Sequence, residues 1–182
     1  GGEQMNSLIL VNRRHAYSPD TKQDLISVHE DHPDILLERE AVCALSSIME
    51  QLGGWEFIVP VSGWRSLEEQ LEIYAKSLQE NGPEFTAKFV AMPGHSEHQT
   101  GLAIDLGLRQ PDIDFIRPAF PYEGICQKFR ELAPAFGFIE RYPAGKEHIT
   151  GIAHEPWHFR YVGMPHSEIM TFKGLTLEEY LA

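Results

Sequence analysis

Cysteine is scarce in this chain, and its few cysteines show no ligand spacing. The 182 residues include only Cys43 and Cys126, which lie far apart and have no nearby Cys or His partner. We therefore expect two buried, reduced thiols rather than a disulfide or a cysteine metal site. A chain of this length needs neither a disulfide nor a structural metal to fold, because a single domain of this size buries a sufficient hydrophobic core.

Basic residues and long apolar runs are also in short supply. Lys and Arg number 15 against 27 Asp and Glu, a formal net charge of -12. This balance argues against a nucleic-acid partner, because phosphate backbones require a basic face. The longest apolar runs, such as residues 8–11 and 57–61, are far too short to span a bilayer, so we expect no membrane partner.

The start of the chain shows no signal peptide, since it lacks a basic region followed by an apolar one. We interpret residues 1–4 as a cloning remnant and Met5 as the natural start. A cytoplasmic protein is the corresponding expectation, with residues 5–182 forming a single domain.

Apolar residues at helical spacing predict three helices, over residues 38–52, 66–81 and 123–135. Ser66 and Glu69 form a capping box at the start of the second helix, in which each side chain bonds the backbone N–H of the other. We expect that helix to bury an apolar face made of Leu67, Leu71, Tyr74 and Leu78.

Short β-branched or aromatic segments predict strands between the helices. Prolines and polar residues make residues 12–36 an expected irregular excursion and residues 109–122 an expected loop or lid. The pattern indicates an α+β fold, a mostly antiparallel sheet with flanking helices. The predicted strands cover residues 8–11, 57–61, 100–106, 138–142 and 157–162.

The most informative segment has the sequence SEHQTGLAID and ends at Asp105. Strand side chains alternate between two faces, so Gly101 and Ala103 share the face of Asp105 while Ile104 points to the core. The two small residues leave space beside the carboxylate. His98 can reach this space if the chain turns just before the strand.

A second motif, HEPWH at residues 154–158, matches the H-E-x-x-H signature of helical zinc proteases. We reject the helical reading, because Pro156 and the strand-like residues after His158 oppose a helix. Glu155 and His158 instead pair with the first motif. Together the motifs offer two imidazoles, a ligand carboxylate and a spare carboxylate, the composition of a catalytic zinc site.

These motifs resemble the VanY/VanX family of zinc D,D-peptidases, which share a fold with the hedgehog signalling domain. The family pattern S-x-H-x-x-G-x-A-x-D is met at every fixed position, and E-x-x-H is met by Glu155 and His158. The upstream Y-R-S/T element appears here as Trp64-Arg65-Ser66, with Trp in place of the usual Tyr. The resemblance spans about residues 57–165 and is nearest to the VanXY type, the D,D-dipeptidase/D,D-carboxypeptidases of vancomycin resistance.

The resemblance implies one zinc ion per chain, held by His98, Asp105 and His158, with Glu155 moving the proton of the attacking water. It also implies that Arg65 stabilises the developing oxyanion, although Arg65 could form a surface ion pair with Glu68 or Glu69. Ser96 and Gln70 are the implied binders of the terminal D-Ala. Ordinary capping and solvation remain open for both.

Four further residues receive no catalytic assignment. We expect Trp157 and Tyr161 to belong to the core, His95 to be exposed, and His154 to lie beside the site or on the surface rather than to bind metal.

The function implied by the resemblance is hydrolysis of D-Ala-D-Ala and of the C-terminal D-Ala of peptidoglycan pentapeptide precursors. The partners are then small D-Ala-terminated peptides and cell-wall precursors. Two alternatives stay open: an L-alanyl-D-glutamate endopeptidase of the phage-lysin type, and a zinc-stabilised, hedgehog-like binding domain without activity. Release of free D-Ala from the dipeptide would distinguish a D,D-peptidase from the endopeptidase. The presence of Glu155 beside His158 argues against the inactive binding domain.

Overall fold

The computed structural model describes residues 6–19 and 22–182, so the predicted remnant at residues 1–4 and the start at Met5 lie outside the described residues. The strands are β1 (Leu25–His29), β2 (His32–Glu38), β3 (Ile58–Ser62), β4 (Ala103–Leu108), β5 (Phe138–Tyr142) and β6 (Glu155–Tyr161). The helices are α1 (Arg39–Leu52), α2 (Leu67–Phe89), α3 (Gly124–Leu132), α4 (Glu147–Thr150), α5 (His166–Lys173) and α6 (Leu177–Leu181). Short 3-10 helices lie at η1 (Gly54–Glu56), η2 (Glu97–Thr100) and η3 (Ala133–Phe136).

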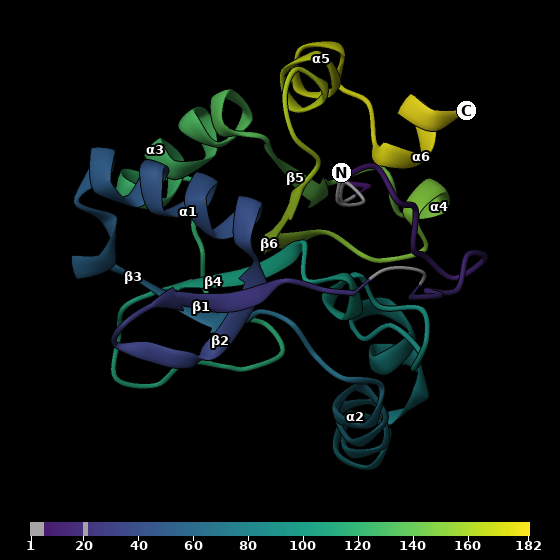
Figure 1. The fold of residues 1–182 in the computed structure, drawn as a ribbon. Helices are drawn as coiled ribbons and strands as arrows, with labels where there is room; N and C mark the ends of the chain where they lie inside the picture. Colours follow the sequence, from purple (N-terminus) through teal and green to yellow (C-terminus); the bar gives the residue numbers. More distant parts are fainter. Residues whose placement is uncertain (1–5, 20–21) are drawn as a thin grey trace.

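Four strands form an antiparallel sheet in the order β3-β4-β6-β5, and β1 and β2 pair as a separate antiparallel hairpin. The helices α1 and α3 lie together on one side of the sheet, while α2 stands apart below it (Figure 1). The predicted α+β fold with a mostly antiparallel sheet is confirmed.

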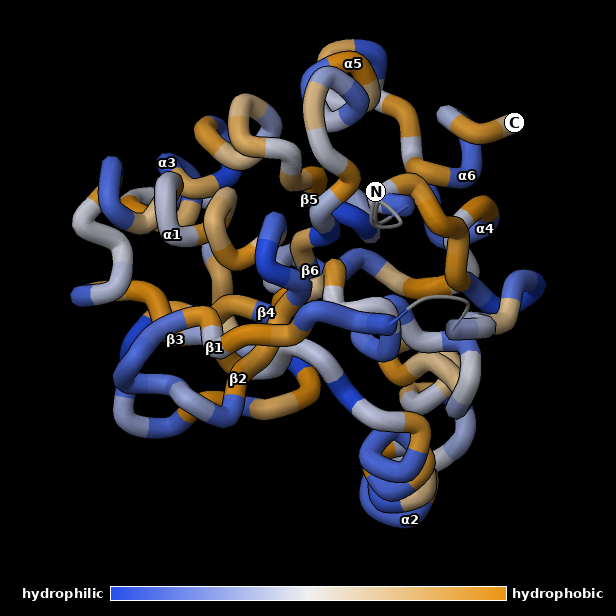
Figure 2. The backbone as a smooth tube through the Cα atoms, in the orientation of Figure 1, coloured by the Kyte–Doolittle hydropathy of each residue, from blue (hydrophilic) through white to orange (hydrophobic). Residues whose placement is uncertain are grey.

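The central strand β4 divides a core face from a site face, as its sequence predicts. Ile104 lies opposite Phe159 in the β4–β6 register, and both are fully buried in the main hydrophobic core with Leu106. Helix α1 covers this core with Leu45 and Ile48. Figure 2 shows the mostly hydrophobic course of β4. The alternate residues Ala103, Asp105 and Gly107 are therefore left for the opposite face.

The N-terminal third differs from the prediction in two places. Residues 8–11 form no strand. The carbonyl of Ile9 instead accepts a hydrogen bond from the Arg160 side chain at 2.7 Å. The excursion predicted over 12–36 contains the β1–β2 hairpin instead of irregular chain alone. Pro33 does not prevent this pairing, because a two-stranded hairpin has edges where a missing N–H is harmless.

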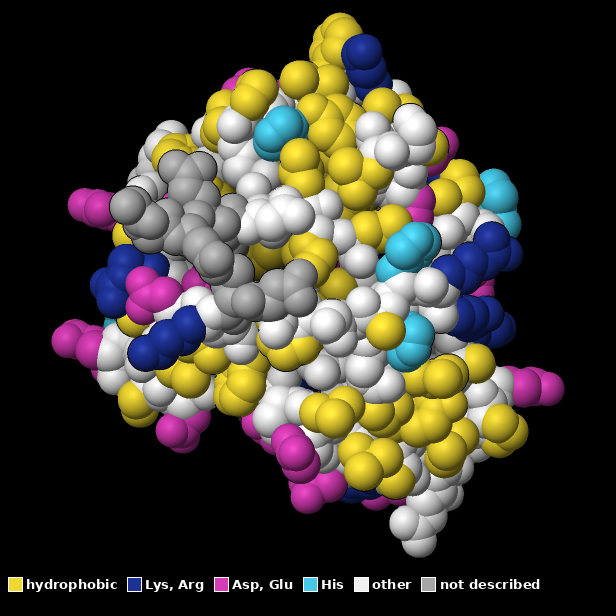
Figure 3. Space-filling model, turned by 45° about the vertical axis from the view of Figure 1, so that its right-hand side comes forward, with side chains coloured by type: hydrophobic (Ala, Val, Ile, Leu, Met, Phe, Trp, Pro, Cys, Tyr) yellow, Lys and Arg dark blue, Asp and Glu magenta, His cyan; other side chains and the backbone are white. Residues whose placement is uncertain are grey.

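Helix α2 has its predicted capping box, with Ser66 and Glu69 bonding each other's backbone. Gly82, at φ 84°, interrupts the helix as a kink, after which the helix resumes to Phe89. The expected burial of the apolar face is wrong, since Leu67 is 50% and Leu71 57% exposed. The lower part of Figure 3, at the height of α2, shows the resulting broad group of hydrophobic side chains.

The two cysteines are free thiols, as expected, but only Cys126 is buried. The prediction of a buried Cys43 is wrong, because this residue lies on the side of α1 that faces solvent. Among the described residues, no helix has the length and apolar character needed to cross a membrane.

Gly101 joins η2 to β4, and a substitution there tests the close packing of this turn. Its φ is +77°, and a Cβ there would lie 2.7 Å from Leu25 Cδ2 and 3.2 Å from Glu38 Cγ. We expect Gly101→Ala to lower the free energy of unfolding by about 2–4 kcal/mol, from left-handed strain plus crowding. Gly145→Ala, at φ +84° with open space around it, should lose only about 1–2 kcal/mol. Urea denaturation measures both, and equal losses would contradict the close packing at Gly101.

Candidate metal centre

Strand register brings two of the predicted ligands face to face. Asp105 on β4 lies directly opposite His158 on β6, one position beyond the core pair of Ile104 and Phe159. Because side chains alternate along both strands, the core pair points one way and the ligand pair points the other. Nδ1 of His158 lies 3.0 Å from Oδ1 of Asp105.

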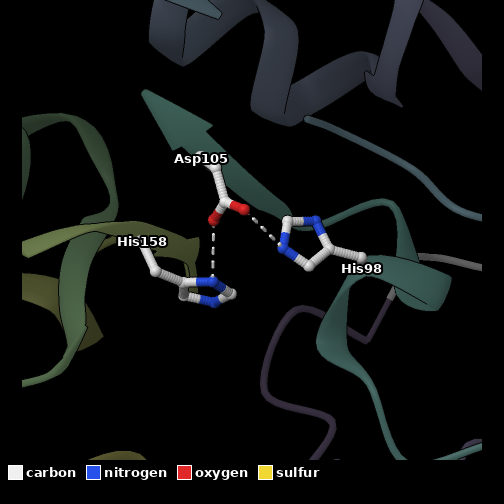
Figure 4. A group of neighbouring side chains, drawn as sticks. All are labelled: His98, Asp105 and His158. Carbon is white, nitrogen blue, oxygen red and sulfur yellow. Dashed lines mark hydrogen bonds and ion pairs between the residues drawn. The ribbon is translucent and has the colours of Figure 1, made fainter. Parts of the chain in front are cut away.

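The third predicted ligand, His98, comes from the turn that precedes β4. Ser96 caps η2 by accepting a hydrogen bond from the His98 N–H at 3.2 Å, and Gly101 ends the turn in the left-handed conformation. The imidazole thereby folds back over the strand, with its Nε2 at 3.3 Å from Oδ2 of Asp105. Figure 4 shows both imidazoles directed at the one carboxylate.

The three side chains have the spacing of a single-ion site. One ligand atom from each of His98, Asp105 and His158 lies within 4.8 Å of the others, and all three residues are buried. Tetrahedral zinc with bonds of about 2.0–2.1 Å places its ligand atoms about 3.3–3.4 Å apart. The two His–Asp distances of 3.3 and 3.0 Å are close to this value.

Hydrogen bonds behind the rings leave the correct nitrogens for a metal. Nδ1 of His98 lies 2.8 Å from the carbonyl of Gly63, and Nε2 of His158 lies 3.0 Å from a carboxylate oxygen of Glu97. Both partners only accept, so these nitrogens carry hydrogen and the opposite nitrogens hold lone pairs in the neutral rings. Two lone pairs then face the Asp105 carboxylate. A cation suits this arrangement, so the residues present fit zinc.

The ionisation of the cluster follows the same geometry. Burial opposes charge on His158, but its hydrogen bonds to Asp105 and Glu97 outweigh burial and raise its pKa to about 9. Burial likewise opposes charge on Asp105, yet the neighbouring His98 and His158 hold the pKa of this carboxyl well below its usual range. A proton and a metal ion therefore compete for Nδ1 of His158.

Glu155 lies at the start of β6, three residues before His158, with its carboxylate 3.7 Å from Nδ1 of that imidazole. Burial raises the pKa of Glu155 well above its usual range, and the negative charge of Asp105 adds to this effect. A carboxyl group with a raised pKa beside a metal site can accept and return a proton. Pro156 is accommodated in the strand, so the helical zinc-protease reading is rightly rejected.

Arg65 is buried in the site and does not form the alternative surface ion pair. Its guanidinium donates to Ser62 Oγ at 2.8 Å and to Gln70 Oε1 at 3.1 Å, and it lies 3.4 Å from Asp105 Oδ2. Gln70 is fully buried and also donates to the carbonyl of Ala91 at 2.8 Å. The observed contacts of Gln70 thus hold Arg65 in place, and substrate binding by Gln70 stays a prediction.

A pocket opens in front of the three predicted ligands, with Glu155, Arg65 and Ser96 in its wall. Two residues of the predicted 109–122 loop, Phe115 and Ile116, form part of the same wall. Residues 109–122 contain no helix or strand, which confirms the predicted loop. Ser96 is therefore placed beside the pocket, and its contact with substrate stays a prediction.

The four unassigned residues lie around this centre. Trp157 is buried in the main core while one side of it borders the pocket, and Tyr161 packs against the same core. His154 lies outside the ligand group, near Tyr122 and Glu140. His95 is half-buried rather than exposed, because its Nδ1 contacts the carbonyl of Asn12 at 2.8 Å.

Sequence reasoning missed the residues behind the ligands. Glu97 is fully buried, and it contacts His158, Arg141 and Arg160. Strand alternation was an available signal for Arg160, because it lies two residues after His158 and shares its face of β6. No local pattern marks Glu97 as buried, since its partners are distant in sequence.

An imidazole and a carboxylate on an antiparallel sheet, a second imidazole from the preceding turn, and a buried glutamate and an arginine beside them define a metallopeptidase-type site. The chain belongs to the VanY family: the model of VanY, D-alanyl-D-alanine carboxypeptidase, matches residues 34–164. The predicted resemblance is confirmed.

Individual relatives agree with this membership. The chain is 42% identical, over 97% of its length and 94% of the relative, to the bifunctional D-Ala-D-Ala dipeptidase and carboxypeptidase VanXYC of Enterococcus gallinarum. The crystal structure of the vancomycin-resistance D,D-dipeptidase VanXYg with a D-Ala-D-Ala phosphinate analogue matches with a TM-score of 0.95 and 55% identity, covering 97% of this chain and 70% of that one. A mutant of the D,D-pentapeptidase VanY from the VanB-type resistance cassette, solved with Zn(II), matches with a TM-score of 0.78 and 29% identity, over 98% and 100% of the two chains.

The ligand set predicts the metal content of variants. We expect His98→Ala to lose its zinc, with affinity falling by more than the roughly 10- to 100-fold typical of losing an outer partner. His154→Ala should keep one zinc per chain, because that imidazole lies outside the cluster. Elemental analysis after dialysis and competition with a chelator measure both variants. Full zinc binding by His98→Ala would contradict the assignment.

Proposed function

We propose that this protein is a zinc-dependent D,D-peptidase that hydrolyses the D-Ala-D-Ala dipeptide and removes the C-terminal D-Ala of peptidoglycan pentapeptide precursors. One observation carries the proposal: the convergence of His98, Asp105 and His158 at the pocket that Glu155 and Arg65 also line, in a chain of the VanY family. Removal of D-Ala-D-Ala ends eliminates the target of vancomycin, which makes resistance to that antibiotic the corresponding role.

The residues divide the chemistry among them. His98, Asp105 and His158 would hold the zinc, which would supply a Lewis acid for the scissile carbonyl and lower the pKa of a water towards about 7. Glu155 takes up the proton of the attacking water and returns it to the departing amine. Arg65 places a fixed positive charge beside the negative charge that develops on the carbonyl oxygen.

The pocket wall supports a small peptide end as substrate. Apolar side chains such as Val90, Ile152 and Trp157 line it together with the polar groups of the site. Phe115 extends the loop over the pocket and stacks against Arg65, whose guanidinium carbon is 5.4 Å from the ring centre. A wall of this kind fits the methyl groups of two alanines and leaves the carboxylate to Ser96. Gln70, which the family also implies as a binder, lies behind this wall and supports it through Arg65.

The cellular setting is part of the same proposal. We infer that residues 5–182 act as one peptidase domain in the cytoplasm, where soluble precursors are made. The partners are small D-Ala-terminated peptides and cell-wall precursors, with no role for nucleic acid or membrane. The net charge of -12 supports the exclusion of nucleic acid.

Substrate assays with purified, zinc-loaded protein test the proposed activity. We expect release of free D-Ala both from D-Ala-D-Ala and from a pentapeptide precursor, and no cleavage of an L-alanyl-D-glutamate bond. Cleavage of that bond alone would favour the phage-lysin type of activity. Zinc binding without any cleavage would favour the hedgehog-like binding domain.

Glu155→Gln should bind zinc normally but lose turnover. The amide keeps the size of the side chain but cannot carry the proton, and such a role contributes typically about 10²- to 10⁴-fold to the rate. We therefore expect kcat for D-Ala release to fall by about that factor. The control is Glu72→Gln on the exposed side of α2, which should leave kcat unchanged. Wild-type kcat in zinc-loaded Glu155→Gln would refute the proton-transfer role.

Arg65→Lys tests the charge beside the carbonyl oxygen. Lysine keeps the positive charge but loses the planar fork that contacts Ser62 and Gln70. Loss of a preorganised donor costs about 2.7–4 kcal/mol of barrier, so kcat should fall by about 10²- to 10³-fold with zinc content retained. Arg109→Lys, which alters contacts to the carbonyls of Trp55 and Glu56, serves as the control. An effect on KM alone would assign Arg65 to ground-state binding instead.

A further inference from the structure

Glu97 lies directly behind a predicted zinc ligand. One of its carboxylate oxygens is 3.0 Å from Nε2 of His158, on the side of the ring away from Asp105. The side chain of Glu97 is completely buried, so water cannot replace this contact. In its neutral form, a ring whose Nε2–H is held by a carboxylate must present its Nδ1 lone pair to Asp105.

The other oxygen of Glu97 is fixed by two guanidinium groups. Arg141 Nε and Arg160 Nη1 each lie 2.7 Å from this oxygen, and both arginine side chains are fully buried. Charge-assisted bonds at this distance are short and strong. Glu97 therefore has no freedom to turn away from His158.

The arginines in turn connect Glu97 to both ends of the described chain. Arg141 forms a two-bond pair with Glu178 of α6, at 2.7 and 2.8 Å, and Asn12 also donates to Glu178 at 3.1 Å. Arg160 donates to the carbonyls of Ser7 and Ile9. The N-terminal segment and α6 lie near each other (Figure 1), and each contacts one of the arginines that hold Glu97.

The charges in this cluster balance without any contribution from the metal ligands. Two carboxylates, Glu97 and Glu178, meet two guanidiniums, Arg141 and Arg160. Buried ion pairs seldom add stability compared with well-packed apolar side chains, so stability alone is a weak reason for building one here. The orientation of the His158 ring gives the cluster a specific use.

We propose that Glu97 is a positioning residue that fixes His158 as a metal ligand, and that the chain Glu97–Arg141–Glu178 makes the metal affinity of the site depend on the docking of α6. This inference rests on the metal site of the proposed function but not on its substrate. Loosening Glu178 frees Arg141, and Arg141 is one of the two groups that aim Glu97 at His158. Docking of helix α6 then stabilises the orientation of the zinc ligand His158 indirectly, through Glu178, Arg141 and Glu97.

Zinc affinity, measured by competition with a chromophoric chelator, tests both parts. Glu97→Gln should weaken zinc binding by about 10- to 100-fold, the usual effect of losing a ligand's outer partner. Glu178→Gln should weaken it less, by roughly 2- to 30-fold, as expected for coupling through an intermediate. The matched control is Glu179→Gln, which removes the neighbouring α6 ion pair to Lys146 while keeping a residue suited to the capping box. This control should leave zinc affinity unchanged.

Nitrogen NMR of the His158 ring supplies a readout that general destabilisation would not produce. In zinc-free protein at a pH above the raised pKa of His158, the wild-type ring should carry its hydrogen on Nε2 alone, whereas the ring of folded Glu97→Gln should exchange between the two tautomers. Folded Glu97→Gln with wild-type affinity would overturn the positioning role. If Glu97→Gln does not fold, Glu178→Gln provides the test. An unchanged zinc affinity in Glu178→Gln, or an equal loss in Glu179→Gln, would overturn the dependence of zinc affinity on the docking of α6. Absence of zinc binding in the wild type would instead refute the proposed function.

Discussion

Asp105 has no solvent to stabilise its charge, because its carboxylate is buried between His98, His158 and Arg65. A buried carboxylate without compensation would be strongly unfavourable. The guanidinium of Arg65 and the imidazole of His158, whose pKa is raised to about 9, supply the compensation. The three neighbours of Asp105 come from different elements: His98 from η2, His158 from β6 and Arg65 from the segment after β3. The order β3-β4-β6 places these three elements around one strand position, so the sheet topology and the electrostatics of the site require each other.

The clustering of His98, Asp105 and His158 was predictable from sequence because two of the three residues are placed by local structure. Alternation along β4 separates Asp105 from the core residue Ile104, and a turn just before the strand returns His98 to the same face. Only the pairing of β4 with β6, which brings in His158, requires information from distant sequence. The family motif supplied that link. The α+β architecture followed in the same way, from helices and strands with clear periodicities.

Burial against distant partners was not predictable, and this explains the errors. The apolar stripe of α2 has helical spacing, but spacing does not say on which side of the helix the protein lies. In the structure the inward side carries Gln70, Ser77 and Thr86, all fully or almost fully buried. Gln70 uses that position to hold Arg65. The burial of Glu97 was not predicted for a related reason: a charged residue is expected at the surface unless its partners are known.

The candidate site has two parts that differ in backbone structure: the predicted ligands with Glu155, and the loop that forms one side of the pocket. The ligands and Glu155 sit on strands or on a capped turn whose backbone is tied into the sheet, which suits groups that must hold their geometry to a fraction of an ångström. The wall formed by Phe115 and Ile116 belongs to a segment without regular structure, held over α2 by Arg117 stacking on the ring of Phe89 at 4.7 Å. Under the proposed function, changes in this loop would alter which peptide ends enter while leaving the strands of the predicted ligands in place. Under the proposed function, register in the sheet therefore positions the residues that carry the chemistry, while Phe115 and Ile116 of the loop would limit which peptide ends reach them.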